Sequence, residues 1–270
     1  MKKTILAIFL ILTLLSFPTF ANGIFNSTNE VFKLNPYTDT ALLVTGVGLS
    51  GASFMIKPTV PAFDGNLLNK NNVNAFDRLI MRPYSKSLDL TSTILEGTAL
   101  LFPAVLMSSP LGEWGTIGTM YAETVLITYG TKELFKIGVD RARPYMYFNG
   151  YPQSKVEDGD YLDSFFSGHS GLAFASATFA SYVFCKYNPD SKWKAPVIAT
   201  SYTLAGTVAS LRLASGNHFL SDVLTGAVFG SAVGFLVPWV HTIGTNPKTP
   251  QSNNVSMNVL PMGLVVNFEY

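Results

Sequence analysis

Five long apolar stretches fill most of the chain after residue 90 and limit what this sequence can fold into. Each is as long, or nearly as long, as the roughly 20 residues that a helix needs to cross a bilayer core. Charged residues make up only 13% of the chain, about half of their usual share in soluble domains. We therefore expect an all-α, membrane-embedded bundle of five to six apolar helices. The stretches are Thr91–Met107, Thr116–Phe135, Gly171–Phe184, Ala195–Leu213 and Phe219–Val240.

Two carboxylates and several small residues lie inside these stretches. Glu96 and Glu123 interrupt two of them, and charged groups at membrane depth usually face the interior of a bundle. Gly226, Gly230 and Gly234 recur in the last stretch, where small residues let helices approach closely. Because the stretches are only moderately apolar, a helical bundle lying wholly outside the membrane remains an alternative.

The first 21 residues have the organisation of a secretory signal peptide. Lys2 and Lys3 precede the apolar run Ile5–Leu15, and Thr19-Phe20-Ala21 supplies a cleavage site of the small-residue type. We expect residues 1–21 to be removed, with an uncleaved anchor helix as the alternative. In either case the chain that follows begins outside the cytoplasm.

Three further parts follow the signal. Residues 22–90 form an N-terminal segment with one short apolar helix, at Ala41–Ile56. Residues 91–244 form the catalytic helical bundle. Residues 245–270 form a C-terminal tail, whose alternation around Pro261 and Gly263 resembles a β-hairpin.

Composition excludes several classes of function. The 18 basic and 17 acidic residues give a net charge of +1, so no overall field would attract nucleic acid. The single cysteine, Cys185, excludes an intramolecular disulfide and a cysteine-based zinc cluster. Only three histidines are present, so an enzyme that needs histidine has few candidates.

The first of three segments with candidate functional residues runs from Lys136 to Pro144. Lys136 and Arg143 are seven residues apart, so both cations lie on one helix face if the segment is helical. Pro144 disfavours helix at the residue before it, so the helix should end there. Two long cations at a helix end suit an anion such as phosphate. Lipid head groups are the other partner that this cluster could have.

The second segment is Ser167-Gly168-His169-Ser170, which opens an apolar stretch. Ser167 is a plausible N-cap, and Gly168 allows a ligand to approach the main chain. The start of a helix favours an anion, and His169 would lie beside it as a proton donor.

The third segment places His218 and Asp222 four residues apart, on one face at the start of a helix. A carboxylate bonded to one imidazole nitrogen would leave the other free as a nucleophile. Gly216 and Asn217 are expected to form the turn and the cap before this helix, and Arg212 supplies a third cation. We expect no metal site here.

Together, the three segments resemble the type 2 phosphatidic acid phosphatase (PAP2) superfamily, whose pattern is K-x6-R-P, then P-S-G-H, then S-R-x5-H-x3-D. The first element is complete in this chain. Two positions depart from the pattern, because Phe166 replaces a proline and Leu211 replaces the common serine. The resemblance covers roughly residues 91–240, and every charged or imidazole group of the pattern is in place.

The resemblance implies a helical bundle of the acid phosphatase–haloperoxidase type, with the motifs at one end, and phosphate ester hydrolysis without a metal or other cofactor. The resemblance implies that His218 attacks phosphorus and forms a phosphohistidine. It also implies that Asp222 orients and activates His218, and that His169 protonates the leaving oxygen. The residues expected to bind the phosphoryl group are Lys136, Arg143, Ser167, Gly168 and Arg212.

We expect a phosphorylated lipid as the substrate, since apolar walls beside cations suit a phosphate on a lipid tail. Undecaprenyl pyrophosphate, phosphatidylglycerol phosphate, phosphatidic acid and a lipid A phosphate are the candidates. The expected location is the inner membrane of a bacterial-type envelope, with the active site facing the periplasm. The alternatives are a soluble periplasmic acid phosphatase acting on small esters, a vanadium-dependent haloperoxidase and a non-catalytic lipid-phosphate binder. We expect Arg141 to face head groups and His241 to be interfacial.

Overall fold

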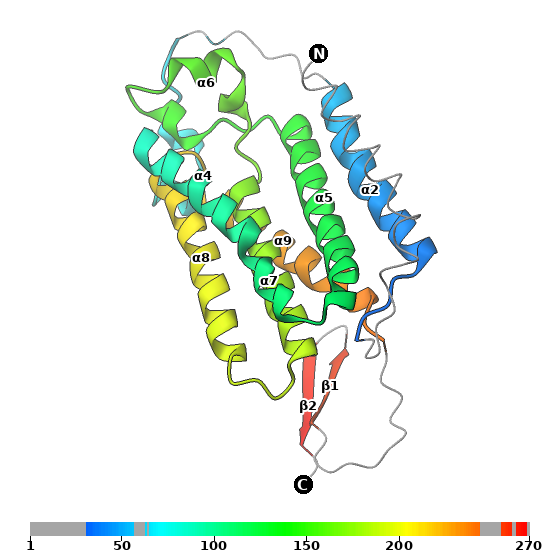
Figure 1. Cartoon of the computed structure of the whole chain (residues 1–270). Coiled ribbons are helices and arrows are strands. Elements are labelled where there is room, and N and C mark those ends of the chain that lie inside the picture. The colour runs from blue at the N-terminus through cyan, green and yellow to red at the C-terminus, as the bar shows by residue number, and fades with distance from the viewer. Residues whose placement is uncertain (1–30, 57–62, 64, 244–254, 261–262, 269–270) are drawn as a thin grey trace, which may run out of the picture.

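The apolar stretches fold as helices in the computed structural model, which describes residues 31–56, 63, 65–243, 255–260 and 263–268 (Figure 1). This architecture confirms the expected all-α bundle, while the expected signal peptide, residues 1–21, lies outside the described residues. The long helices of the described chain are α2 (Pro36–Met55), α4 (Lys86–Leu101), α5 (Trp114–Gly138), α7 (Gly168–Tyr187), α8 (Lys194–Ala214) and α9 (Leu220–Val240).

Short helical turns connect the long helices. They are η1 (Lys70–Asn72), α3 (Ala75–Arg78), η2 (Phe102–Ser108), η3 (Leu111–Glu113), η4 (Pro144–Tyr147), α6 (Gln153–Glu157) and η5 (Asp160–Leu162). The expected C-terminal hairpin is present, because β1 (Val255–Leu260) pairs antiparallel with β2 (Gly263–Phe268).

Helix α7 lies in the middle of the bundle and contacts α4, α5, α8 and α9, while α2 packs against α5 (Figure 1). Its buried Phe179 and Val183 belong to the main apolar cluster, with Met120 of α5 and Val233 of α9. Burial of such side chains stabilises a fold by about 1.5–3 kcal/mol each. Four long helices therefore pack against one central helix.

Glycines at every fourth position of α9 let this helix approach α7 very closely. Residues four apart lie on one helix face, so Gly226, Gly230 and Gly234 form a stripe. A Cβ atom added at any of the three would overlap a main-chain carbonyl oxygen of α7 or of its N-cap. The small residues expected to allow close helix packing do so at this contact.

Hydrogen bonds join the first turns of the same two helices. The N–H of Ser167 donates to the carbonyl oxygen of Asp222 at 3.1 Å. The hydroxyl of Ser170 donates to the carbonyl oxygen of Val223 at 2.9 Å. The starts of α7 and α9 consequently lie together, although they are far apart in the sequence.

Three segments of the described chain are long and apolar enough to cross a membrane, by length and composition: Lys86–Ser108, Lys194–Ala214 and Leu220–Val240. Large apolar side chains are exposed on their outer surfaces, including Ile94 and Leu101 on α4 and Val228 on α9. Hydrocarbon would cover such side chains at less cost than water. These features support a membrane protein.

Replacing Gly230 by alanine should destabilise the fold, because the added methyl group meets the main chain of α7 rather than a movable side chain. We expect the free energy of unfolding to fall by about 1–3 kcal/mol, as for other overpacked cores. The matched control is Gly206→Ala on α8, where nothing lies within 4 Å of the added atom. The stability of that variant should equal or exceed that of the wild type, because alanine is more favourable than glycine in a helix by about 1 kcal/mol. Equal thermal midpoints of the two variants in detergent would contradict the close packing.

Candidate active site

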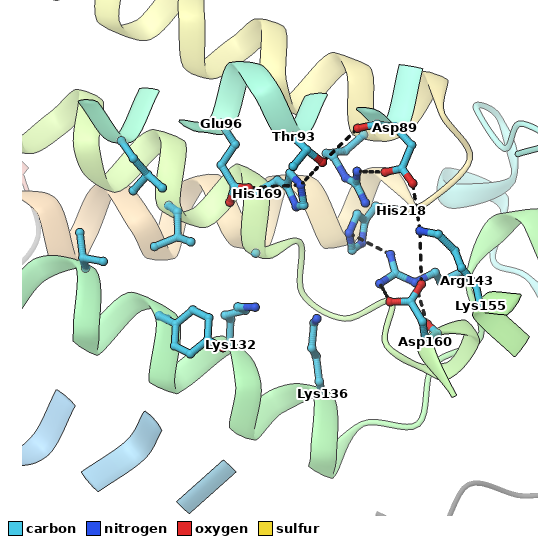
Figure 2. Close-up of a pocket in the computed structure, with 16 residues that line it drawn as sticks. Asp89, Thr93, Glu96, Lys132, Lys136, Arg143, Lys155, Asp160, His169 and His218 are labelled. Carbon is cyan, nitrogen blue, oxygen red and sulfur yellow. Dashed lines mark hydrogen bonds and ion pairs between the residues drawn. The ribbon is translucent and has the colours of Figure 1, made fainter. Parts of the chain in front are cut away.

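A cavity of about 510 Å³ lies at the end of the bundle where α7 and α9 begin (Figure 2). All three sequence motifs contribute to its walls, as their spacing predicts. The lining residues are Asp89, Thr93, Glu96, Leu100, Val125, Tyr129, Lys132, Lys136, Arg143, Lys155, Asp160, Gly168, His169, Leu172, Arg212 and His218.

His218 lies in the turn between α8 and α9, and its surroundings select one tautomer. Its Nδ1 lies 2.7 Å from the carbonyl oxygen of Ser164, which can only accept a hydrogen bond, so Nδ1 carries the proton. Nε2 faces an N–H of Arg143 at 3.2 Å. Burial and the nearby positive charges of Arg143 and Arg212 hold the pKa of His218 well below its usual value. A neutral imidazole with its lone pair on Nε2 is the form that can act as a nucleophile.

Gly216 makes the turn before His218 in the way that the sequence predicts. Its φ of 72° is left-handed, and an added Cβ would overlap the carbonyl oxygen of Arg82. Asn217, by contrast, is not the helix cap. The N-cap of α9 is Phe219, whose N–H donates to the side chain of Asp222 at 2.8 Å. The cap therefore lies two residues later than expected, because Asp222 supplies the acceptor.

Asp222 does not make the direct hydrogen bond to His218 that its spacing suggests. Its Oδ2 lies 3.8 Å from Nδ1 of His218, whose proton goes to the Ser164 carbonyl instead. That oxygen accepts from the hydroxyl of Ser164 at 2.6 Å. The carboxylate thus holds the residue whose carbonyl orients the imidazole, so its effect on His218 passes through Ser164.

Arg141 was expected to face lipid head groups, but it lies behind the site. Its guanidinium forms ion pairs with Asp77, at 2.6 Å, and with Asp222, and both carboxylates are fully buried. Burial raises the pKa of Asp77, but hydrogen bonds from Ser221, Asn74 and Arg141 bring it below its ordinary value. Arg141 consequently pairs with two buried carboxylates that a lipid-facing arginine could not reach.

His169 reaches the cavity from the first turn of α7. Its Nε2 lies 3.1 Å from the hydroxyl of Thr93 and 3.2 Å from a carboxylate oxygen of Glu96, both on α4. Ser167 is the N-cap of α7, as predicted, and accepts a hydrogen bond from the N–H of Ser170. Gly168 lines the cavity, whereas the buried Ser167 is not among the lining residues of the described chain.

The departure from the family pattern at Phe166 has a structural explanation. Its ring is buried and lies 5.5 Å from that of Phe135 on α5 and 5.4 Å from that of Phe229 on α9, measured between centroids. Aromatic pairs at such separations stabilise packing. Phe166 therefore anchors the approach to Ser167 by packing.

The cavity lining carries five cationic side chains and three carboxylates. Arg143 binds Asp160 at 2.8 Å, and Arg212 binds Asp89. Lys155 lies between the same two carboxylates, 3.0 Å from Asp89 and 3.5 Å from Asp160. These pairs hold the cations in position around the cavity.

Two lysines of α5 face this group from the opposite wall (Figure 2). Lys136 makes a weak pair with Asp163 at 4.0 Å, and Lys132 pairs with Glu133. The side chain of Lys132 also covers Gly168, since an added Cβ at that glycine would meet its Cδ at 2.7 Å. An anion in the cavity would therefore have cations on two sides and the start of α7 on a third.

Sequence reasoning missed part of this site. Lys136 and Arg143 do not share a helix face as expected, because α5 ends at Gly138 and Arg143 is extended. Lys132 does lie one helical turn before Lys136, so helical spacing was a usable signal for that lysine. Asp89 and Glu96 lie on α4, while Lys155 and Asp160 lie on the short turns α6 and η5. No spacing in the sequence relates these four residues to the motifs.

The comparisons with known proteins agree with the motifs. The sequence model of the PAP2 superfamily matches residues 118–244. A lipid A 1-phosphatase of Porphyromonas gingivalis is 36% identical over 83 residues, which are 31% of this chain. The chain spans only 17% of the length of that relative.

A solved structure also aligns with this chain, the first transmembrane PAP2 type phosphatidylglycerolphosphate phosphatase from Bacillus subtilis. The alignment covers 85% of this chain and 94% of that one, at 20% identity and a TM-score of 0.35.

Proposed function

We propose that this chain, which belongs to the PAP2 superfamily through residues 118–244, hydrolyses a phosphate monoester or pyrophosphate on a lipid through a phosphohistidine intermediate. The observation that carries the proposal is the single cavity on which two histidines and five cations converge. Phosphoryl transfer needs mainly positioning and neutralisation of spread negative charge, and these side chains supply both. The name of the Porphyromonas relative, lipid A 1-phosphatase, supports a lipid substrate.

His218 is the proposed nucleophile. With the proton on Nδ1 held by the Ser164 carbonyl, Nε2 carries the lone pair that would form the bond to phosphorus once the Arg143 N–H that faces it turns to a phosphoryl oxygen. Arg143, 3.2 Å from Nε2, is placed to bind an oxygen of the same phosphoryl group. Asp222 acts as a positioning residue through Ser164.

His169 is the proposed acid and base. As the bond from phosphorus to the leaving oxygen breaks, the protonated imidazole gives its proton to that oxygen. The neutral imidazole then takes a proton from water, which attacks phosphorus, breaks the bond to His218 and releases phosphate. Burial, together with the positive charges of Arg212 and Lys132, lowers the pKa of His169 to about 2 in the free protein. We propose that the negative charge of the bound substrate raises this pKa before the first step.

The phosphoryl oxygens are proposed to bind between the two cationic walls. Arg143 stands on one side, and Lys136 faces it from α5 (Figure 2). Arg212 also lines the cavity. Gly168 brings the start of α7 to the same point, where main-chain N–H groups favour an anion. Ser167 supports that turn as its N-cap, and we keep it in the proposed phosphate-binding set.

Apolar side chains share the cavity with these charges, which favours a lipid over a small ester. Leu100, Val125 and Leu172 line it, and the α4 segment beside it is one of the three candidate membrane spans. A phosphate held among the cations could leave its acyl or prenyl chain against these residues. The candidates remain undecaprenyl pyrophosphate, phosphatidylglycerol phosphate, phosphatidic acid and a lipid A phosphate.

The proposed orientation places the cavity on the periplasmic side of the inner membrane. Lys186 ends α7 and Lys194 begins α8, so these cations lie at the end of the bundle away from the cavity (Figure 1). Cytoplasmic connections carry an excess of such residues. Basic residues at the cavity end, such as Arg78 and Lys86, favour the opposite orientation by the same rule, so the orientation needs a direct test.

Alanine substitution should separate the roles of the two histidines. His218→Ala should lower kcat by about 10⁴-fold or more, as for other lost nucleophiles. His169→Ala should cost about 10²–10⁴-fold, as for a lost acid and base. After reaction with a ³²P-labelled substrate and quenching in base, the wild type and His169→Ala should carry label on histidine, and His218→Ala should carry none. Label that persists in His218→Ala would refute the assignment. Matching thermal midpoints would establish that both variants fold.

Lipid phosphates should be better substrates than small esters. We expect the purified chain to release phosphate from at least one lipid of the candidate panel with a kcat/KM at least about 10-fold above that for p-nitrophenyl phosphate. Initial rates should not change when EDTA is added, and vanadate should inhibit. Release from cells by osmotic shock together with a preference for small esters would favour the soluble phosphatase. Prompt loss of the initial rate in EDTA would contradict the proposed chemistry.

Single cysteines can report the orientation once Cys185 is replaced by alanine. In intact spheroplasts, a membrane-impermeant maleimide should label Ser154→Cys, an exposed position on α6 at the cavity end. The same reagent should label Asp190→Cys, exposed between α7 and α8, only after the membrane is opened. The reverse pattern would place the cavity in the cytoplasm.

A further inference from the structure

A second group of ionisable residues lies at the end of the bundle opposite the cavity. Asp39 belongs to the first turn of α2, Glu123 to α5, and His241 is the C-cap of α9. The start of α2 and the end of α9 lie together at the end away from α6 (Figure 1). One side-chain donor atom from each residue lies within 4.8 Å of the other two. Three distant segments of the chain thus bring donors to one point.

The sequence position of His241 suggested an interfacial residue, but the structure buries it in this cluster. Its Nδ1 lies 2.7 Å from the carbonyl oxygen of Val237, an arrangement that places the proton on Nδ1. Its Nε2 lies 2.6 Å from Asp39 and 3.7 Å from Glu123. An imidazole whose Nδ1 is held by a main-chain carbonyl, with Nε2 facing carboxylates, is oriented as a metal ligand commonly is.

Glu123 has a feature that ordinary core packing does not explain. It is fully buried, and neither of its carboxylate oxygens has a hydrogen-bond partner among the residues that the structure describes. Within the same residues, no lysine or arginine forms an ion pair with Asp39 or Glu123. A buried carboxylate without a partner is costly, so a charge of opposite sign at this point would stabilise the fold.

We propose that Asp39, Glu123 and His241 bind one divalent transition-metal ion, of which Zn²⁺ fits best. One imidazole nitrogen and two carboxylate oxygens are a normal zinc donor set, with water in the fourth position. Bonds of about 2.0–2.2 Å place the donors of a tetrahedral ion about 3.3 Å apart. The present separations of 2.6 and 3.7 Å from Nε2 lie on either side of that value. The imidazole favours Zn²⁺ over Mg²⁺ or Ca²⁺.

Such an ion would join α2 to α5 and α9. Asp39 lies at the beginning of α2, the helix that packs against the outside of α5. The ion would therefore fasten the N-terminal helix to the bundle at one end, while glycines allow its close contact with α5 along its length. This site does not touch the cavity and is independent of the proposed hydrolysis.

The test uses the full chain, purified in detergent, stripped with a chelator and titrated with ZnCl₂. We expect one Zn²⁺ per chain by elemental analysis after dialysis, and a rise in the thermal midpoint with added Zn²⁺. Glu123→Gln and His241→Gln should each weaken binding at least about 10-fold, because each removes a ligand. The matched control is Glu113→Gln, since Glu113 is also buried but binds the hydroxyl of Tyr187 at 2.6 Å. This control should keep one Zn²⁺ per chain.

Three results would overturn the proposal. The wild type could bind no more Zn²⁺ than Glu123→Gln, which would mean that a shared proton stabilises the carboxylates. The control Glu113→Gln could lose Zn²⁺ equally, which would make the binding unspecific. If the ligand variants fail to fold, X-ray absorption of the zinc-loaded wild type decides. One nitrogen and two or more oxygen ligands support the site, whereas a sulfur ligand from Cys185 or a shell of water alone refutes it.

Discussion

The close contact of α7 and α9 is the constraint on which the rest of the structure depends. Without side chains at Gly226, Gly230 and Gly234, the main chains of the two helices lie against each other. Main-chain hydrogen bonding between Ser167 and Asp222 then joins their first turns. The histidines of the second and third motifs are carried by these two turns, so the helix contact is what brings both imidazoles to one cavity.

Carboxylates offset part of the positive charge in the cavity before any substrate enters. Asp89 and Asp160 bind the two arginines, and Lys155 lies between the carboxylates. Although burial raises the pKa of Asp160, Arg143 and Lys155 bring it below its ordinary value, so it stays ionised. Five cations would repel one another at this distance without such partners. The carboxylates therefore keep the cationic groups ordered, and a phosphoryl group has to compete with them for the arginines.

The two ends of the bundle solve the problem of buried charge differently. At the cavity end, Asp77 and Asp222 share the guanidinium of Arg141, and every one of these carboxylates has hydrogen-bond donors. At the other end, Asp39 and Glu123 lie close to each other, and the imidazole of His241 is the basic group that pairs with both of them among the described side chains. The first cluster contains an arginine, whose positive charge is permanent, whereas the second has no lysine or arginine partner among the described residues, which is the physical basis for the proposed ion.

The sequence by itself determined the helices and the core of the site. Apolar stretches and turn residues are local signals, and they predict the long helices and Ser167 as an N-cap without knowledge of the rest of the fold. Helical spacing did not place Lys136 beside Arg143, because α5 ends at Gly138 and Arg143 is extended. Lys132 was within reach of the same spacing rule. Only the tertiary structure decided that Asp89, Glu96, Lys155 and Asp160 complete the cavity, that the Ser164 carbonyl holds His218, and that His241 is buried with Asp39 and Glu123. These contacts join segments distant in the chain, and periodicity carries no information about which helix faces pack together.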